Sequence, residues 1–94
     1  MKTPNDYANE IISLSEQFSR YSGEYAQLLH TRGQFYVSQR ANFKSDTAVQ
    51  RAFDITDDGI KMSVLKLKLS ALKVQMSANK TMINLASEEA RGLY

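Results

Sequence analysis

The stretch Ser63–Val74, S-V-L-K-L-K-L-S-A-L-K-V, is compatible with either a strand or a helix. Leu65, Leu67 and Leu69 alternate with lysines, which is the pattern of a half-buried β-strand. This alternation lasts five residues, whereas an apolar spacing of three and four continues for more than twenty. No glycine or proline interrupts the longer pattern, so the stretch is predicted to lie within a long helix.

The predicted helix carries apolar residues on two opposite sides. The main seam, which has the a and d spacing of a heptad repeat, consists of Met62, Leu65, Leu69, Leu72, Met76, Asn79, Ile83 and Ala86. The second seam, on the other side of the helix, consists of Ile60, Val64, Leu67, Ala71, Val74, Ala78 and Leu85. A helix that is apolar on two sides must be covered on two sides.

The first forty residues predict another long helix, which can cover the main seam. Thr3 and Pro4 suit a helix start. Apolar residues then recur in heptads at Tyr7, Ile11, Leu14, Phe18, Tyr21, Tyr25 and Leu28. We therefore predict an all-α fold in a single domain, residues 1–94. It is a long antiparallel, coiled-coil-like hairpin with helices at about 4–40, 45–54 and 57–91.

The short middle helix is too small to cover the second seam. We therefore expect two chains to dimerise into a four-helix bundle through this seam. The alternative is a monomeric hairpin whose second seam stays partly exposed. Beyond the predicted helix stop at Gly92, the apolar pair Leu93 and Tyr94 is expected to pack against the bundle.

Charge is unevenly distributed along the chain. Residues 1–31 carry four acids and two cations, whereas residues 59–87 carry five lysines and no acid. Antiparallel pairing is expected to bring Glu24 near Lys61 or Lys68, and such pairs select orientation more than they stabilise. A basic surface for an anionic partner is the competing interpretation.

The chain offers little for catalysis, and we expect no enzyme activity, no metal and no cofactor. It has no cysteine and one histidine, His30, which has no acid partner at helical spacing. The segment Asp54–Gly59 faintly resembles a calcium loop, but Leu65 stands where that loop needs a bidentate glutamate. Helix capping explains the segment better. With no membrane-length apolar run and no signal peptide, a complete cytoplasmic protein is expected.

Aromatic residues and cations alternate around the middle helix. The candidate partner-binding residues are Arg32, Phe35, Tyr36, Arg40, Phe43, Lys44 and Arg51. Such rings can stack on bases while the cations hold phosphates. Together with Phe53, the aromatic residues can instead form a plug that closes the end of the hairpin, with solvated cations around it.

Several stretches together suggest a family. They are the amphipathic start Tyr7–Leu29, the middle A-V-Q-R-A-F-D-I-T-D-D-G (Ala48–Gly59), K-L-K-L-S-A-L-K-V (Lys66–Val74) and the ending E-E-A-R-G-L-Y (Glu88–Tyr94). The chain resembles the small helical proteins of bacteriophage recombination modules, above all the first of the two anti-RecBCD accessory proteins of P22-type lambdoid phages. The resemblance spans nearly the whole chain.

This resemblance implies a non-enzymatic accessory protein of DNA recombination in the host cell cytoplasm. It would modulate the host RecBCD helicase-nuclease through protein–protein contacts, directly or with a co-encoded phage inhibitor, so that linear phage DNA is not degraded. Two alternatives remain open. One is a nucleic-acid-binding accessory protein of the phage replication or recombination module, and the other is a structural coiled-coil adaptor.

Overall fold

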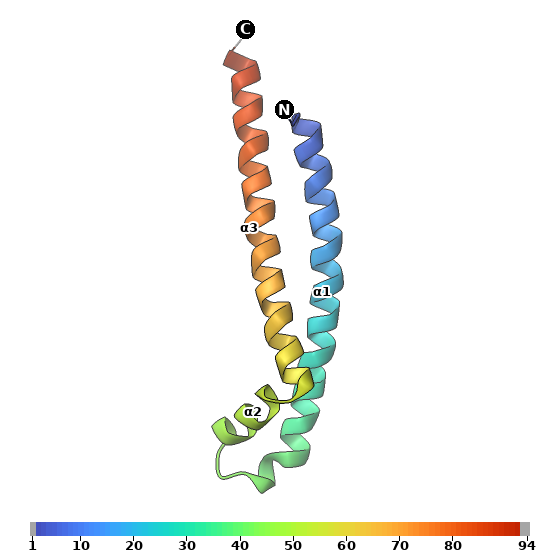
Figure 1. Ribbon diagram of the computed structural model, residues 1–94, viewed down its shortest axis with the longest axis vertical. Helices are drawn as coiled ribbons and strands as arrows, with labels where there is room; N and C mark the ends of the chain where they lie inside the picture. Colours follow the sequence, from blue (N-terminus) through green and yellow to red (C-terminus); the bar gives the residue numbers. More distant parts are fainter. Residues whose placement is uncertain (1, 93–94) are drawn as a thin grey trace. The chain divides into compact units, whose positions relative to one another are not determined.

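The computed structural model describes residues 2–92, with side chains as far as Glu89, and its regular structure is helical throughout. The elements are α1 (Pro4–Gln39), the 3-10 turn η1 (Arg40–Asn42), α2 (Asp46–Asp54) and α3 (Asp57–Gly92), shown in Figure 1. No β-strand occurs within residues 2–92, so the predicted all-α class is confirmed and α3 contains the stretch 63–74. The expected contacts of Leu93 and Tyr94 lie outside the described residues.

Short-range capping signals set where the helices begin. Thr3 and Asp6 cap α1 reciprocally, with the Asp6 N–H donating to Thr3 Oγ1 at 3.2 Å and the Thr3 N–H donating to the Asp6 carboxylate at 2.8 Å. Ser45 caps α2, because its Oγ accepts a first-turn backbone N–H at 3.1 Å. Thr56 caps α3 in the same way at 3.2 Å. Capping therefore accounts for the segment Asp54–Gly59.

The chain falls into two compact units, and each unit contains parts of both long helices. The first unit combines the beginning of α1, up to Arg20, with α3 from Leu69 onward. The second unit, Tyr21–Lys68, contains the rest of both helices together with α2. The expectation of a single domain stays a prediction.

In the first unit α1 and α3 pack in antiparallel order. Lys73 Nζ lies 5.8 Å from the ring centroid of Phe18. One turn and a half further along α3, Asn79 Nδ2 donates a hydrogen bond to Glu10 Oε2 at 3.0 Å. Asn79 is the polar residue of the main seam. The bond to Glu10 gives its side-chain amide a hydrogen-bond partner, and it forms only when the two helices are aligned so that these residues meet.

The second unit contains most of the well-buried side chains. Val49 and Phe53 of α2 are 1% and 2% exposed, and Leu65 of α3 is 3% exposed. The rings of Phe53 and Phe35 pack with centroids 5.5 Å apart. Full burial of an apolar side chain contributes about 1.5–3 kcal/mol, so these residues attach α2 to both long helices.

The two seams of α3 differ in exposure as the heptad pattern predicts. In the main seam Met62, Leu65 and Leu72 are buried and the other residues are half-buried. Every residue of the second seam is exposed, Leu67 by 73% and Val74 by 70%. Within residues 2–92, therefore, the chain leaves its second seam uncovered.

Two lysines of α3 lie over aromatic rings of α1. In addition to Lys73, Lys68 places its Nζ 5.2 Å from the ring centroid of Tyr21, a favourable cation–π position. Glu24 and Lys61 line one small cavity, as expected, but no ion pair joins them within the described residues. Aromatic rings of α1 thus contact lysines of α3, for which acidic partners on α1 had been predicted.

Gly59 allows the end of α2 to approach the first turn of α3. The residue is buried, and a Cβ atom there would lie 2.6 Å from Asp54 Cα and closer still to the carbonyl oxygen of Phe53. Both are backbone atoms, so they cannot give way as a flexible side chain would. The corner between α2 and α3 therefore requires glycine at this position.

We predict that Gly59→Ala lowers the free energy of unfolding by about 1–3 kcal/mol through overpacking. This exceeds the gain of at most about 1 kcal/mol from the higher helix propensity of alanine. Gly33→Ala is the matched control, because a Cβ atom there has nothing within 4 Å. The control should raise the free energy of unfolding by about 0.5–1 kcal/mol. Urea unfolding followed by circular dichroism measures both, and equal shifts would contradict the close approach at Gly59.

Candidate functional site

The candidate partner-binding residues all belong to the second unit. They come from α1 (Arg32, Phe35, Tyr36), η1 (Arg40), the loop before α2 (Phe43, Lys44) and α2 itself (Arg51). Most of these residues make contacts with other residues of the second unit. The sequence patterns did not specify these contacts. Lys44 and Arg51 are exposed and form no ion pair within residues 2–92.

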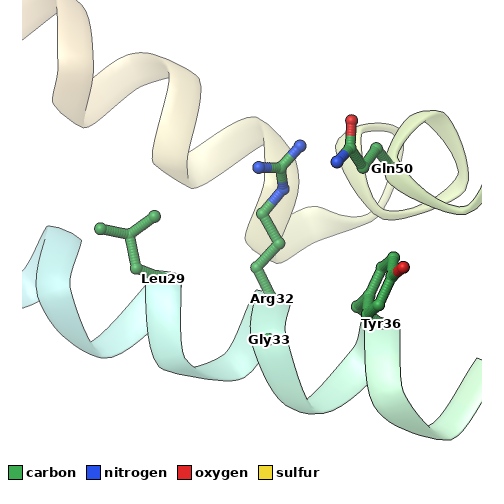
Figure 2. A pocket seen from close by; sticks show the side chains of 5 residues that line it. All are labelled: Leu29, Arg32, Gly33, Tyr36 and Gln50. Carbon is green, nitrogen blue, oxygen red and sulfur yellow. The ribbon is translucent and has the colours of Figure 1, made fainter. Parts of the chain in front are cut away.

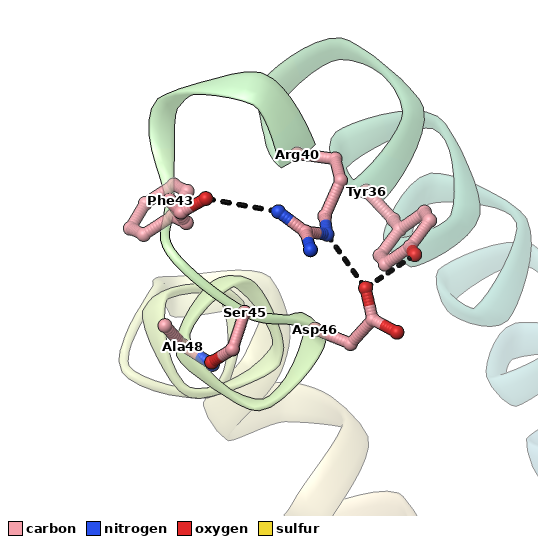
Figure 3. Close-up of polar contacts among 6 residues, drawn as sticks. All are labelled: Tyr36, Arg40, Phe43, Ser45, Asp46 and Ala48. Atoms are coloured by element: carbon pink, nitrogen blue, oxygen red, sulfur yellow. Dashed lines mark hydrogen bonds and ion pairs between the residues drawn. The ribbon is translucent and has the colours of Figure 1, made fainter.

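A polar network ties the end of α1 to the start of α2 (Figure 3). The hydroxyl of Tyr36 donates to Asp46 Oδ1 at 2.7 Å, and Arg40 Nε donates to the same oxygen at 2.6 Å. Arg40 Nη1 also donates to the carbonyl oxygen of Phe43 at 2.9 Å. Asp46 lies in the first turn of α2, where a negative charge is favourable. Its role as the shared acceptor was not predicted.

The network also shifts the ionisation of its members. The pKa of Asp46 lies below its ordinary value because the Tyr36 hydroxyl, and then the Arg40 guanidinium, donate to its carboxylate. The bond to Asp46 raises the pKa of Tyr36, and it likewise raises the pKa of Arg40. All three shifts lead away from neutrality, so the network keeps one charge state between roughly pH 5 and pH 9.

Arg32 and Phe35 continue the heptad positions of α1 and are used for packing. The Phe35 ring lies against Phe53 at an interplanar angle of 59°, a favourable tilted arrangement. Arg32 Nη2 lies 3.6 Å from Asp54 Oδ1, and its Nε is buried without a hydrogen-bond partner. The contact of Phe35 with Phe53 agrees with an aromatic plug, whereas Arg32 was expected to be solvated and is partly buried.

An open cavity of about 350 Å³ lies beside these residues (Figure 2). It is lined by Leu29, Arg32, Gly33, Tyr36 and Gln50. A shallower hollow of about 640 Å³ shares Leu29 and Gly33 with it and extends to His30, Gln34, Val37 and Ser38. We call these two cavities, together with exposed Lys44 and Arg51, the α2-end surface.

The most exposed apolar residue of the α2-end surface is Val37, which is 81% exposed. Leu29 is 46% exposed, and Gly33 between them has no side chain to fill the hollow. Sequence reasoning missed Leu29, Val37 and Gln50 as surface residues. The available signal was Gly33 within a helix, which leaves space between the neighbouring turns.

Residues 2–92 contain neither a metal-binding cluster nor a helix that could cross a membrane. No group of three or more His, Asp or Glu side chains there is placed to hold a metal ion. In the same part of the chain, no helix is both long enough and apolar enough to cross a bilayer. His30 is exposed at the rim of the shallower hollow.

We predict that Asp46→Asn lowers the thermal unfolding midpoint at pH 7, because it weakens the bonds to Tyr36 and Arg40. The pKa of Asp46 is lowered in the folded state, so its contribution is present above the ordinary value near about 4 and is lost as the pH falls through the folded value. The difference in midpoint between wild type and Asp46→Asn should therefore shrink from pH 7 to pH 3. Glu16→Gln, an exposed control on α1, should leave the midpoint unchanged. A difference that persists undiminished at low pH would contradict this role of the network.

Comparisons with known proteins add no family to this geometry. A scan against models of protein families, a search of curated proteins and a search of solved structures each find no match to the chain.

Proposed function

We propose that this protein is a non-enzymatic interaction protein that binds a protein partner through its α2-end surface. The observation that supports the proposal is the open cavity pair in which Leu29 and Val37 are exposed. Exposed apolar side chains beside a hollow are typical of protein–protein contact sites. Lys44 and Arg51 add exposed cations in the same compact unit.

The sequence resemblance suggests which partner this surface serves. Anti-RecBCD accessory proteins of P22-type phages modulate the host RecBCD helicase-nuclease. We therefore propose RecBCD, or a co-encoded phage inhibitor of it, as the partner during phage DNA recombination. In this role the protein performs no chemical step, and it changes the action of the enzyme on linear DNA by docking.

The contacts at the α2 end favour a protein partner over nucleic acid. Stacking on bases requires free ring faces, but the Phe35 ring packs on Phe53. The exposed cations that remain, Lys44 and Arg51, can neutralise few phosphates. Steeply salt-dependent binding to single-stranded DNA would instead support the nucleic-acid alternative.

The partner proposal predicts that purified RecBCD, alone or with the co-encoded inhibitor, binds the protein in a biosensor assay. Lys44→Glu with Arg51→Glu should weaken this binding about tenfold or more, since charge reversals at an interface rim cost about 1.4 kcal/mol or more together. Lys66→Glu with Lys80→Glu changes the net charge equally and should have little effect. Absence of binding to either target, or equal losses for both pairs, would contradict the proposal.

We further propose that two copies of the chain associate through the second seam. The chain exposes 7063 Å², whereas a folded monomer of its mass, 10.6 kDa, is expected to expose about 5,500 Å². The excess per chain is about twice the roughly 800 Å² that each partner buries in a standard interface. Apart from Met82, the large apolar side chains that are exposed on the described part of α3 all belong to the second seam: Ile60, Val64, Leu67, Val74 and Leu85.

Self-association predicts that Leu67→Asp with Val74→Asp reduces the sedimentation mass from two chains to one. Helical content should remain, because both side chains are more than two-thirds exposed in the single chain. Ile12→Asp with Ser19→Asp is the matched control, since it adds the same charges at the same spacing on exposed positions of α1. The control should keep the mass of two chains. An unchanged mass for the α3 variant would exclude the second seam as the interface.

A further inference from the structure

The second seam specifies how two copies would pair, and this inference rests on the proposed self-association. Helix α3 is continuous from Asp57 to Gly92, so heptad positions can be followed along it. Thr81 is exposed and occupies the heptad position of the second seam between Ala78 and Leu85. We infer that two α3 helices pair antiparallel through this seam, about a two-fold axis that passes between Leu72 and Lys73.

In this alignment large residues lie opposite small ones at the centre. Leu67 lies opposite Ala78 of the second copy, and Val74 lies opposite Ala71. The outer layers pair Val64 with Thr81 and Ile60 with Leu85. All layers except the outermost one, Ile60 with Leu85, have similar total volumes, and such layers pack without gaps or overfilling.

A parallel alignment in register would pair each layer with itself. Two leucines would then meet at Leu67 and two alanines would meet at Ala71 and at Ala78. Wide layers would hold the helices apart at the alanine layers and leave voids there, which destabilise a core. The distribution of side-chain sizes therefore favours the antiparallel pair.

The lysines beside the seam help to favour this antiparallel alignment over the two alignments that are shifted by one heptad. Lys61 and Lys68 border the seam, and in the inferred alignment they face Met82 and Gln75 of the second copy. A shift of one heptad in one direction would place Lys68 opposite Lys68, which is repulsive. The opposite shift would place Val64 opposite Glu88 and leave Ile60 opposite Gly92. Each shift thus removes apolar pairs, and one also adds repulsion.

The other border of the seam allows the helices to approach closely. It consists of Ser63, Ser70, Ser77 and Asn84, which are all exposed. Small polar residues there make little steric demand, and Ser70 lies opposite Ser77 of the second copy. Interhelical distances of about 8–10 Å are usual for such packing.

Paired spin labels measure this alignment directly, because the chain has no cysteine of its own. Lys61→Cys and Gln75→Cys would each be labelled with a nitroxide, and the distance between the two copies would be measured by double electron–electron resonance. At about 1.5 Å per residue, the inferred pair places the two 75 positions about 8 Å apart along the axis and the two 61 positions about 35 Å apart. Light scattering of each labelled chain confirms that it retains the mass of two chains.

A long distance at 61 together with a short one at 75 supports the inferred alignment. Short distances at both positions mean parallel pairing and overturn the inference, while self-association stands. A long distance at 75 also overturns it, because the axis then lies elsewhere. A mass of one chain for the unmodified protein overturns the proposed self-association itself.

Discussion

Leu65 and Leu72 of the main seam of α3 are buried, while the heptad residues of α1 are half-buried. Helix α3 has a second apolar side, where Leu67 and Val74 remain exposed. Residues 2–92 contain no third long helix that could cover them. Exposed apolar surface is unfavourable in water, so the helix that organises the fold also carries the surface for which we propose self-association.

The α2 corner illustrates how a cluster that suggests binding can be largely structural. Asp46 holds Tyr36 and Arg40, and Phe53 holds Phe35. These contacts fix the unit that carries the α2-end surface, and they leave other side chains free to contact a partner. The residues that stabilise this corner therefore lie only one or two helical turns from the residues proposed to contact a partner. A substitution at this corner can change stability as well as binding.

Much of the fold follows from short-range patterns. The heptads placed both seams of α3 correctly, and capping residues such as Thr3 and Ser45 marked helix starts, since these effects depend only on neighbouring residues. The contacts of Asp46 and the close approach at Gly59 could not be predicted, because they depend on how α2 folds back after η1. Likewise, the hollow between Leu29 and Val37 appears only when the surroundings of Gly33 are known. Sequence patterns thus identified the candidate region but not which of its residues are free.

The account depends on the second seam being covered by another copy of the chain. If it is covered in this way, unfolding is coupled to dissociation, and stability must depend on protein concentration. The direct measurement is the thermal unfolding midpoint of the unmodified protein over about a hundredfold range of concentration, under reversible conditions. The account predicts that the midpoint rises steadily with concentration, and a midpoint that is the same at every concentration would contradict it.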